Sequence, residues 1–260
     1  MAIDWAVSNF AHPEKQQKGG EDTWYIVENE KESSVGVFDG VGGWLDYGVD
    51  PRKWALVMAD EVEKSVLPFQ GLITTLEKAY DSASQMGIDG SCTACLVYHQ
   101  NEINSVKYAN LGDSGFAVYR EGQVIFETFE QTHGFNFPYQ LSSDKADLPS
   151  DADRGTIGVK KGDVIVVASD GLWDNLYHVE IAKIVDNHYD VGVIAQNLSI
   201  SAMEASFDPK RWSPFAQKAV EEIYAGRNPD DVTWEPEAAP LTKYLGGKTD
   251  DITVIVGRVY

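Results

Sequence analysis

The chain has 260 residues, of which 43% are hydrophobic and 11% aromatic, so it has enough apolar material for a core and is not a disordered sequence. Its 41 acidic residues outnumber 21 basic ones, and the net charge of −20 opposes electrostatic binding to nucleic acid or to an anionic membrane. Such a surface also serves solubility, so the charge alone assigns no function. We expect residues 1–260 to form one domain.

The amino terminus lacks the basic and apolar regions of a secretory signal, and no apolar run reaches the roughly twenty residues of a membrane span. We therefore expect a soluble, intracellular chain, cytoplasmic as given, with no membrane partner. A mitochondrial or plastid location stays open if a presequence was removed. We also expect a monomer, although the sequence does not fix the oligomeric state.

Hydrophobic periodicity predicts strands and helices in separate blocks. Strands are predicted at about residues 23–28, 34–39, 91–98, 103–110, 115–119, 123–127, 156–159, 163–169 and 252–259. Helices are predicted at about residues 51–67, 70–86, 178–187, 190–206 and 214–225. Residues 128–154 and 226–249 lack clear periodicity and are predicted surface loops. This segregation favours an α+β layer fold over a regular βαβ alternation.

The two cysteines, Cys92 and Cys95, lie in an apolar, β-branched run that predicts a buried strand. Positions i and i+3 of a strand point to opposite faces, so the pair is poorly placed to share a metal or a disulfide. We expect two ordinary core thiols, which are compatible with a reducing compartment.

Four aspartates lie where a predicted strand meets a turn. Asp39 and Asp170 each end a strand, whereas Asp113 and Asp250 each precede one. In an antiparallel sheet the end of one strand lies beside the start of its neighbour, so these carboxylates can gather at one edge. Carboxylates so near to one another destabilise the fold unless a cation neutralises them. Hard oxygen ligands favour Mg²⁺ or Mn²⁺, with Ca²⁺ as a competitor.

Each aspartate taken alone also fits a simple turn, because Asp-Gly is a common hairpin signal. Four in matching strand contexts, with adjoining glycines that let backbone carbonyls approach an ion, favour a metal site instead.

The motifs around these aspartates resemble those of type 2C protein phosphatases in order and spacing over nearly the whole chain. The motifs that carry the resemblance are Phe38-Asp39-Gly40-Val41-Gly42-Gly43, Gly90-Ser91-Cys92-Thr93-Ala94, Asn110-Leu111-Gly112-Asp113-Ser114, Ala168-Ser169-Asp170-Gly171-Leu172-Trp173-Asp174 and Thr249-Asp250-Asp251-Ile252-Thr253-Val254, with Glu21-Asp22 near the amino terminus. The resemblance implies two mixed β-sheets packed on each other and flanked by helices on both outer sides, a four-layer αββα fold.

The resemblance also implies hydrolysis of phosphoserine or phosphothreonine in a phosphoprotein by a metal-activated water, with two, and in some members three, Mn²⁺ or Mg²⁺ ions. Asp39 should bridge two ions, and the Gly40 carbonyl should bind one of them. Asp170 and Asp250 should complete one ion's ligands and are, with Asp39, the expected catalytic residues.

Two further sets of acidic residues take roles from the same resemblance. Glu21 and Asp22 should act on the other ion, directly or through water. Asp113, with Asp170 and Asp174, matches a more loosely held third site.

The chain departs from many family members at two positions. Val41 stands where they have a histidine that protonates the leaving oxygen, and His133 is a candidate replacement. Gln17 stands where they have an arginine, so Lys15 or Lys18 is a candidate phosphate contact, although both also fit solvated lysines.

The segments at residues 131–141 and 213–217 are similar to a subgroup that includes mitochondrial phosphatases and plastid relatives. An alternative function is a phosphatase-like pseudoenzyme that binds phosphoproteins without cleaving them, but every acidic ligand position is filled. A structural Ca²⁺-binding protein is a third reading, and the sequence lacks an EF-hand loop.

Overall fold

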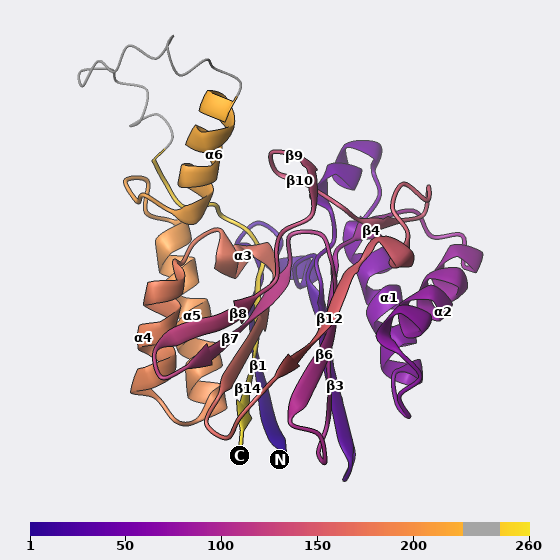
Figure 1. Cartoon of the computed structure of the whole chain (residues 1–260). Coiled ribbons are helices and arrows are strands. Elements are labelled where there is room, and N and C mark those ends of the chain that lie inside the picture. The colour runs from indigo at the N-terminus through magenta and orange to yellow at the C-terminus, as the bar shows by residue number, and fades with distance from the viewer. Residues whose placement is uncertain (226–244) are drawn as a thin grey trace.

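A computed structural model describes residues 1–225 and 245–260, and two five-stranded sheets form its centre (Figure 1). The first sheet has the order β12-β6-β5-β3-β2, with β2 (Thr23–Glu28), β3 (Glu32–Phe38), β5 (Ala94–Gln100), β6 (Ser105–Leu111) and β12 (Asp153–Gly158). The second has the order β1-β14-β13-β7-β8, with β1 (Ile3–Phe10), β7 (Gly115–Arg120), β8 (Gln123–Glu127), β13 (Val164–Ala168) and β14 (Ile252–Val259). All described pairs in both sheets are antiparallel, which corrects the mixed sheets implied by the family resemblance.

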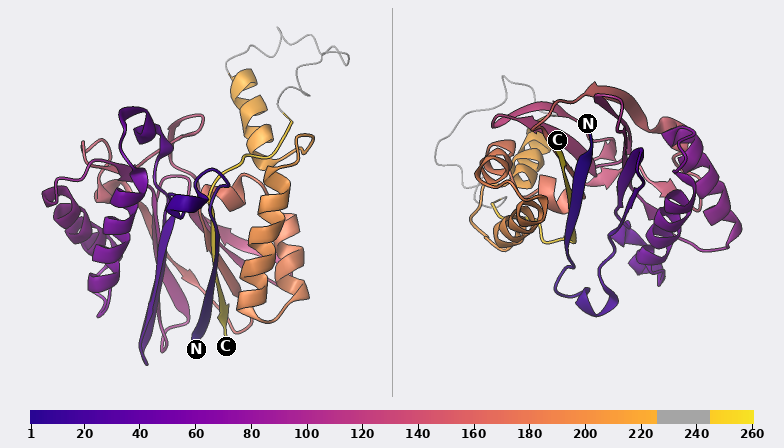
Figure 2. Two further views of the ribbon diagram at one scale, coloured as in Figure 1. Left: turned by 180° about the vertical axis from the view of Figure 1, so that it is seen from behind. Right: turned by 90° about the horizontal axis from the view of Figure 1, so that it is seen from below.

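Helices cover the outer face of each sheet, as the two views in Figure 2 show. The first sheet carries α1 (Pro51–Ser65) and α2 (Leu72–Gln85), and the second carries α4 (His178–Asn187) and α5 (Val191–Ser206). The short α3 (Asp170–Trp173) and α6 (Pro214–Ala225) lie at one end of the sandwich (Figure 1). The predicted four-layer α+β fold is confirmed. None of the helices in the described ranges is long and apolar enough to cross a membrane.

Three apolar clusters hold the four layers together: one between the sheets and one beneath each helical layer. The alternation along β5 divides its side chains between two of them, because neighbouring residues of a strand point to opposite faces. Cys95 and Val97 lie between the sheets, whereas Leu96 lies under α1 and α2. Cys92 belongs to the helix-side cluster, so the expectation of two separate core thiols is confirmed.

The helix α1 illustrates how local sequence fixes a layer. Asp50 caps its first turn by accepting a hydrogen bond from the Arg52 backbone amide, and Pro51 takes the first helical position. Trp54, Met58 and Val62, four residues apart, are fully buried against the first sheet. Burying each such side chain stabilises the fold by roughly 1.5–3 kcal/mol.

The predicted strand at 91–98 is interrupted at Thr93, which separates β4 (Ser91–Cys92) from β5. The Thr93 backbone amide donates to the Asp39 carbonyl at 2.9 Å, and the Asp39 amide donates to the Thr93 hydroxyl at 3.2 Å. This break therefore anchors the backbone of the aspartate that follows β3.

The structure differs from the predicted secondary structure in two regions. The first is strand β1, which was not predicted, because its side chains are mostly half-buried and give no clear alternation. Its partner β14 is also nearly the whole chain away, from Ile3 opposite Val259 to Phe10 opposite Ile252.

The predicted loop at 128–154 contains three short strands, β9 (Thr132–Gly134), β10 (Phe137–Pro138) and β11 (Leu141–Ser142). The first two pair as a hairpin, here called the flap, and β11 pairs with β4 and buries Leu141. Of the other predicted loop, residues 226–244 lie outside the described residues, and 245–249 contain no helix or strand.

Candidate metal centre

Strand register brings the predicted acidic turns to one end of the sandwich. Ala168, the last residue of β13, pairs with Gly115 on one side and Val254 on the other, so the turns before β7 and β14 flank the end of β13. In the first sheet Thr23 pairs with Phe38, which places the turn before β2 beside the end of β3. Because the two sheets pack face to face, both groups of turns meet in one cleft.

This acidic cleft has a volume of about 890 Å³ and a strongly negative lining. Seven carboxylates line it: Glu21, Asp39, Asp46, Asp113, Asp144, Asp170 and Asp250. Two lysines, Lys15 and Lys248, and the glycines Gly40, Gly42 and Gly43 are also among its walls. At Gly40 a Cβ would lie 3.0 Å from the Glu21 carbonyl oxygen, so the close approach of two backbones favours glycine there.

Asp39 lies at the centre of the charge repulsion in the cleft. Burial, followed by the charges of Asp22 and Asp170, raises the pKa of Asp39 well above its usual range. Burial also raises the pKa of Asp170 to about 6, even though the nearby Lys248 acts to lower it. With seven carboxyl groups and two lysines in its lining, the cleft has more acidic groups than its own cations can offset.

Asp22 lies behind the cleft surface and is almost fully buried. Its Oδ2 accepts hydrogen bonds of 2.7 Å from the hydroxyls of Ser169 and Thr253, whereas Oδ1 is buried without a partner. Burial and the charge of Asp251 raise the pKa of Asp22 to about 8. Asp22 thus links the turn before β2 to the ends of β13 and β14.

Asp251 is a buried residue whose role the sequence reasoning missed. Its Oδ2 accepts from the Glu21 amide at 2.8 Å and its Oδ1 from the His12 amide at 2.7 Å, so it fixes the amino-terminal loop against the start of β14. The Asp250-Asp251 pair in the sequence was the available signal, but only the hydrogen bonds of the folded chain show that the second carboxylate binds backbone amides.

Lys15 lies in the cleft, and Lys18 does not. The Lys15 ammonium is 2.5 Å from Glu21 Oε2, 3.4 Å from Asp251 Oδ2 and 3.7 Å from Asp250 Oδ1. Burial acts to lower its pKa, but these carboxylates, Glu21 foremost, hold the pKa above its usual value. Lys18 is exposed at the end of a short 3₁₀ turn and is not among the cleft-lining residues.

Two lysines that the sequence reasoning did not single out bind the remaining acidic positions. Asp174 Oδ1 accepts from Lys218 of α6 at 2.9 Å, and its Oδ2 accepts from Lys248 at 2.9 Å. Although burial acts to raise it, these two ammonium groups lower the pKa of Asp174. Lys248 also contacts Asp170.

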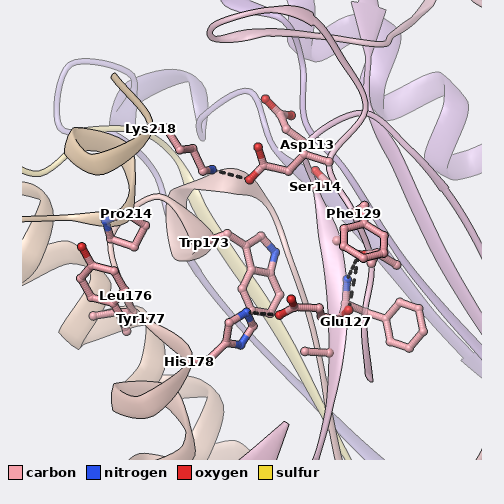
Figure 3. Close-up of a pocket in the computed structure, with 15 residues that line it drawn as sticks. Asp113, Ser114, Glu127, Phe129, Trp173, Leu176, Tyr177, His178, Pro214 and Lys218 are labelled. Carbon is pink, nitrogen blue, oxygen red and sulfur yellow. Dashed lines mark hydrogen bonds and ion pairs between the residues drawn. The ribbon is translucent and has the colours of Figure 1, made fainter. Parts of the chain in front are cut away.

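Asp113 lies between the acidic cleft and two smaller cavities. One of these, of about 380 Å³, is drawn in Figure 3, with Lys218 and Asp113 at its upper end and Trp173 and His178 below. Asp113 and Lys218 also line a third cavity, of about 390 Å³, beside the flap.

His133 belongs to the flap-side cavity and is not among the residues that line the acidic cleft. Its Nε2 lies 3.0 Å from both carboxylate oxygens of Asp147, and its ring stacks on Tyr139 at a centroid distance of 4.2 Å. These contacts tie the flap to the segment that follows it.

The chemistry of the cleft fits hard divalent cations. Within the described chain, buried carboxylate oxygens of Asp22, Asp113 and Asp170 have no hydrogen-bond partner, and such oxygens are costly unless a cation or donor meets them. No group of three His, Cys, Asp or Glu side chains in the described ranges is already arranged around one point as metal ligands. The lysine ammonium groups lie between the carboxylates instead, so side-chain movement must accompany metal binding.

Comparison with known proteins identifies the class to which this fold and cleft belong. No protein-family model matches the chain. The chain is 39% identical to Probable protein phosphatase 2C 80 of Arabidopsis thaliana over 258 residues, 95% of this chain and 56% of that protein. It is 36% identical to the Protein phosphatase PTC7 homolog of Homo sapiens over 262 residues, 92% of this chain and 79% of that protein.

Solved structures agree with these relatives. The photosystem II phosphatase PBCP superposes with a TM-score of 0.89 at 30% identity, covering 100% of this chain and 99% of the other. The catalytic domain of the serine/threonine phosphatase PstP, solved with two manganese ions, has the same fold, with a TM-score of 0.65 at 14% identity, covering 99% of each chain.

The chain belongs to the type 2C protein phosphatases. It spans about half the length of the first two Arabidopsis relatives, 56% of one and 50% of Probable protein phosphatase 2C 55.

Proposed function

We propose that this chain is a Mn²⁺- or Mg²⁺-dependent protein serine/threonine phosphatase that hydrolyses phosphomonoesters with water. The observation that carries the proposal is the gathering of Asp39, Asp170 and Asp250 in one cleft, from three turns far apart in the sequence. Family membership supports the reaction type, and its relatives are named as protein phosphatases.

The carboxylates in and behind the cleft supply the ligand types that two or three such ions require. By resemblance to the family, Asp39 would serve both ions and the Gly40 carbonyl one of them, and Asp170, Asp250, Glu21 and Asp22 would supply the other ligands. The PstP domain with two manganese ions is a relative in fold that supports a two-ion site. A third, weaker ion would use Asp113, Asp170 and Asp174.

Bound divalent ions would supply the positive charge that acidifies water and offsets the charge on the phosphoryl oxygens. The protein's own part is to hold the acidic residues at fixed spacing. Thr93 anchors the Asp39 backbone, and Asp251 anchors the Glu21 backbone. These side chains would act by holding the ions and the phosphate in place, because phosphoryl transfer needs little covalent chemistry from side chains.

Lys15 is the better of the two candidate phosphate contacts. Its ammonium is already in the cleft beside Glu21 and Asp250, whereas Lys18 is exposed outside it. Val41 lines the cleft and has no titratable group, so a proton for the leaving oxygen must come from elsewhere. The pairing of His133 with Asp147, away from the acidic cleft, favours water over His133 as that donor.

The substrate we propose is a phosphoprotein that presents phosphoserine or phosphothreonine, and residues 1–260 act as one phosphatase domain. A mitochondrial or plastid location is proposed on the likeness to organellar family members. The pseudoenzyme alternative would require a defective metal site, yet each acidic position expected from the family is present.

The test is hydrolysis of p-nitrophenyl phosphate and a phosphothreonine peptide with Mn²⁺, Mg²⁺, Ca²⁺ or EDTA. Turnover with Mn²⁺ or Mg²⁺, and its loss with EDTA, is expected. Ca²⁺ should bind yet support little turnover, because its looser coordination positions the reactants less well. Binding of the phosphopeptide with no turnover under any metal would favour the pseudoenzyme.

A further inference from the structure

Lys218 and Lys248 occupy both oxygens of a carboxylate that a third ion would need. Asp174 Oδ1 accepts from Lys218 and Oδ2 from Lys248, each at 2.9 Å. Lys248 also binds Asp170 and lies 3.5 Å from Asp250 Oδ2. A divalent ion that uses Asp174 therefore competes with these two ammonium groups for its oxygens, and their like charges oppose its entry.

The position of Lys248 is fixed by its backbone. Its amide donates to Asn175 Oδ1 at 3.0 Å, and its carbonyl accepts from Asn175 Nδ2 at 2.8 Å. Asn175 is fully buried directly after Asp174, so the clamp keeps the lysine beside the acidic cluster. The Lys248 side chain is only 15% exposed, which means that its ammonium has few alternative positions.

Lys218 is held less firmly. It projects from α6, is 34% exposed, and binds Glu130 as well as Asp174. Figure 3 shows it reaching across the upper end of the cavity beside Asp113. Since its long side chain can swing into solvent, Lys218 is the ammonium group that an incoming ion displaces at the lower cost.

Two unpartnered oxygens show that the cluster has further binding capacity. Asp170 Oδ1 and Asp113 Oδ1 are buried without a hydrogen-bond partner in the described chain, and Asp170 is only 5% exposed. An ion at this position would gain these oxygens together with the Asp174 oxygen released by Lys218.

We propose that Lys218 and Lys248 are built-in counter-cations that compete with a third divalent ion, and that Lys218 is the group displaced when this ion binds. The proposal rests on the metal-dependent function proposed above. The lysines then set the metal concentration at which the third site fills, because the ion competes with their positive charges for the carboxylate oxygens.

The test is calorimetric titration of Mn²⁺ into metal-free wild-type protein and four variants at fixed ionic strength. Lys218→Met should tighten binding of the weakest ion by about tenfold or more, because a charge next to Asp174 is removed. Lys218→Arg keeps the charge and should remain close to wild type. Lys183→Met, at an exposed position of α4, is the matched control and should change nothing.

Two further readouts separate competition from a general structural effect. Metal-free Lys218→Met should unfold at a lower temperature than wild type, yet show the larger upward shift on adding Mn²⁺. Lys248→Met should tighten a second ion as well, because Lys248 also contacts Asp170 and Asp250.

The proposal would be overturned if Lys218→Met bound its weakest Mn²⁺ ion with wild-type affinity. It would also be overturned if every variant bound two Mn²⁺ ions and no third. Either result would leave the metal-dependent phosphatase intact. No Mn²⁺ binding to any form, including wild type, would overturn both proposals.

Discussion

Replacing Asp170 by asparagine should abolish turnover and yet stabilise the metal-free protein at alkaline pH. Asp170 is buried, and its pKa is raised from 3.8 to about 6. The Asp170 carboxyl therefore keeps its proton to a higher pH in the folded state than in the unfolded state. Stability contributed by this group falls as the pH rises from about 4 through 6 and stays reduced above that range.

The size of the effect follows from the shift. A difference of about two pKa units corresponds to about 3 kcal/mol of unfolding free energy at pH 8, an order-of-magnitude figure. Asparagine has no charge to desolvate, so Asp170→Asn should recover much of this amount. The lost contact with Lys248 is offset because Lys248 keeps Asp174 and Asp250.

The assay is urea unfolding of wild type and Asp170→Asn in EDTA at pH 5 and pH 8. The variant should be more stable than wild type at pH 8, and the two should approach each other at pH 5. Asp81→Asn, at an exposed position of α2, should show no such difference. A variant less stable than wild type at pH 8 by 1 kcal/mol or more, on the order of one lost hydrogen bond, would refute the repulsion argument.

Two other substitutions test how the site is built. Gly171→Ala would place a Cβ 2.0 Å from the Asp251 carbonyl oxygen and move the start of β14. It should cost about 1–3 kcal/mol of unfolding free energy and weaken Mn²⁺ binding. Gly134→Ala, with nothing within 4 Å of its Cβ, should change neither the unfolding free energy nor the Mn²⁺ affinity. His133→Gln should slow p-nitrophenyl phosphate and phosphothreonine peptide by similar factors, because the lost contact with Asp147 loosens the flap; a loss of about 10²-fold or more on the peptide alone would instead make His133 the proton donor.

The fold was predictable from sequence where its signals are local. Helix α1 has a capping aspartate, a proline and a regular apolar spacing, and its observed start is the predicted one. The acidic turns were recognised because each stands at the end or start of a run that predicts a strand. Strand β1 was not found, since its pairing with β14 depends on residues near the opposite end of the chain.

The contacts around the site were less predictable than its acidic members. Lys218 looks in the sequence like any lysine on an amphipathic helix. Only the tertiary placement of α6, whose Phe215 amide donates to the Asp174 carbonyl at 3.0 Å, brings it to Asp174. Asp251 has the same chemistry as its neighbour Asp250, but its oxygens accept from the His12 and Glu21 backbone amides, whereas Asp250 lies beside Lys248. Side-chain direction at such positions is a tertiary property.

The central claim is that Asp39 organises a metal centre that hydrolyses phosphomonoesters. Its most direct test is kcat for a phosphothreonine peptide at saturating Mn²⁺, measured for wild type and Asp39→Asn with circular dichroism to show that both are folded. Wild type should turn over, and Asp39→Asn should lose at least about 10²-fold in kcat, because its carboxylate is the proposed bridge between two ions. A folded Asp39→Asn with wild-type kcat would contradict the account.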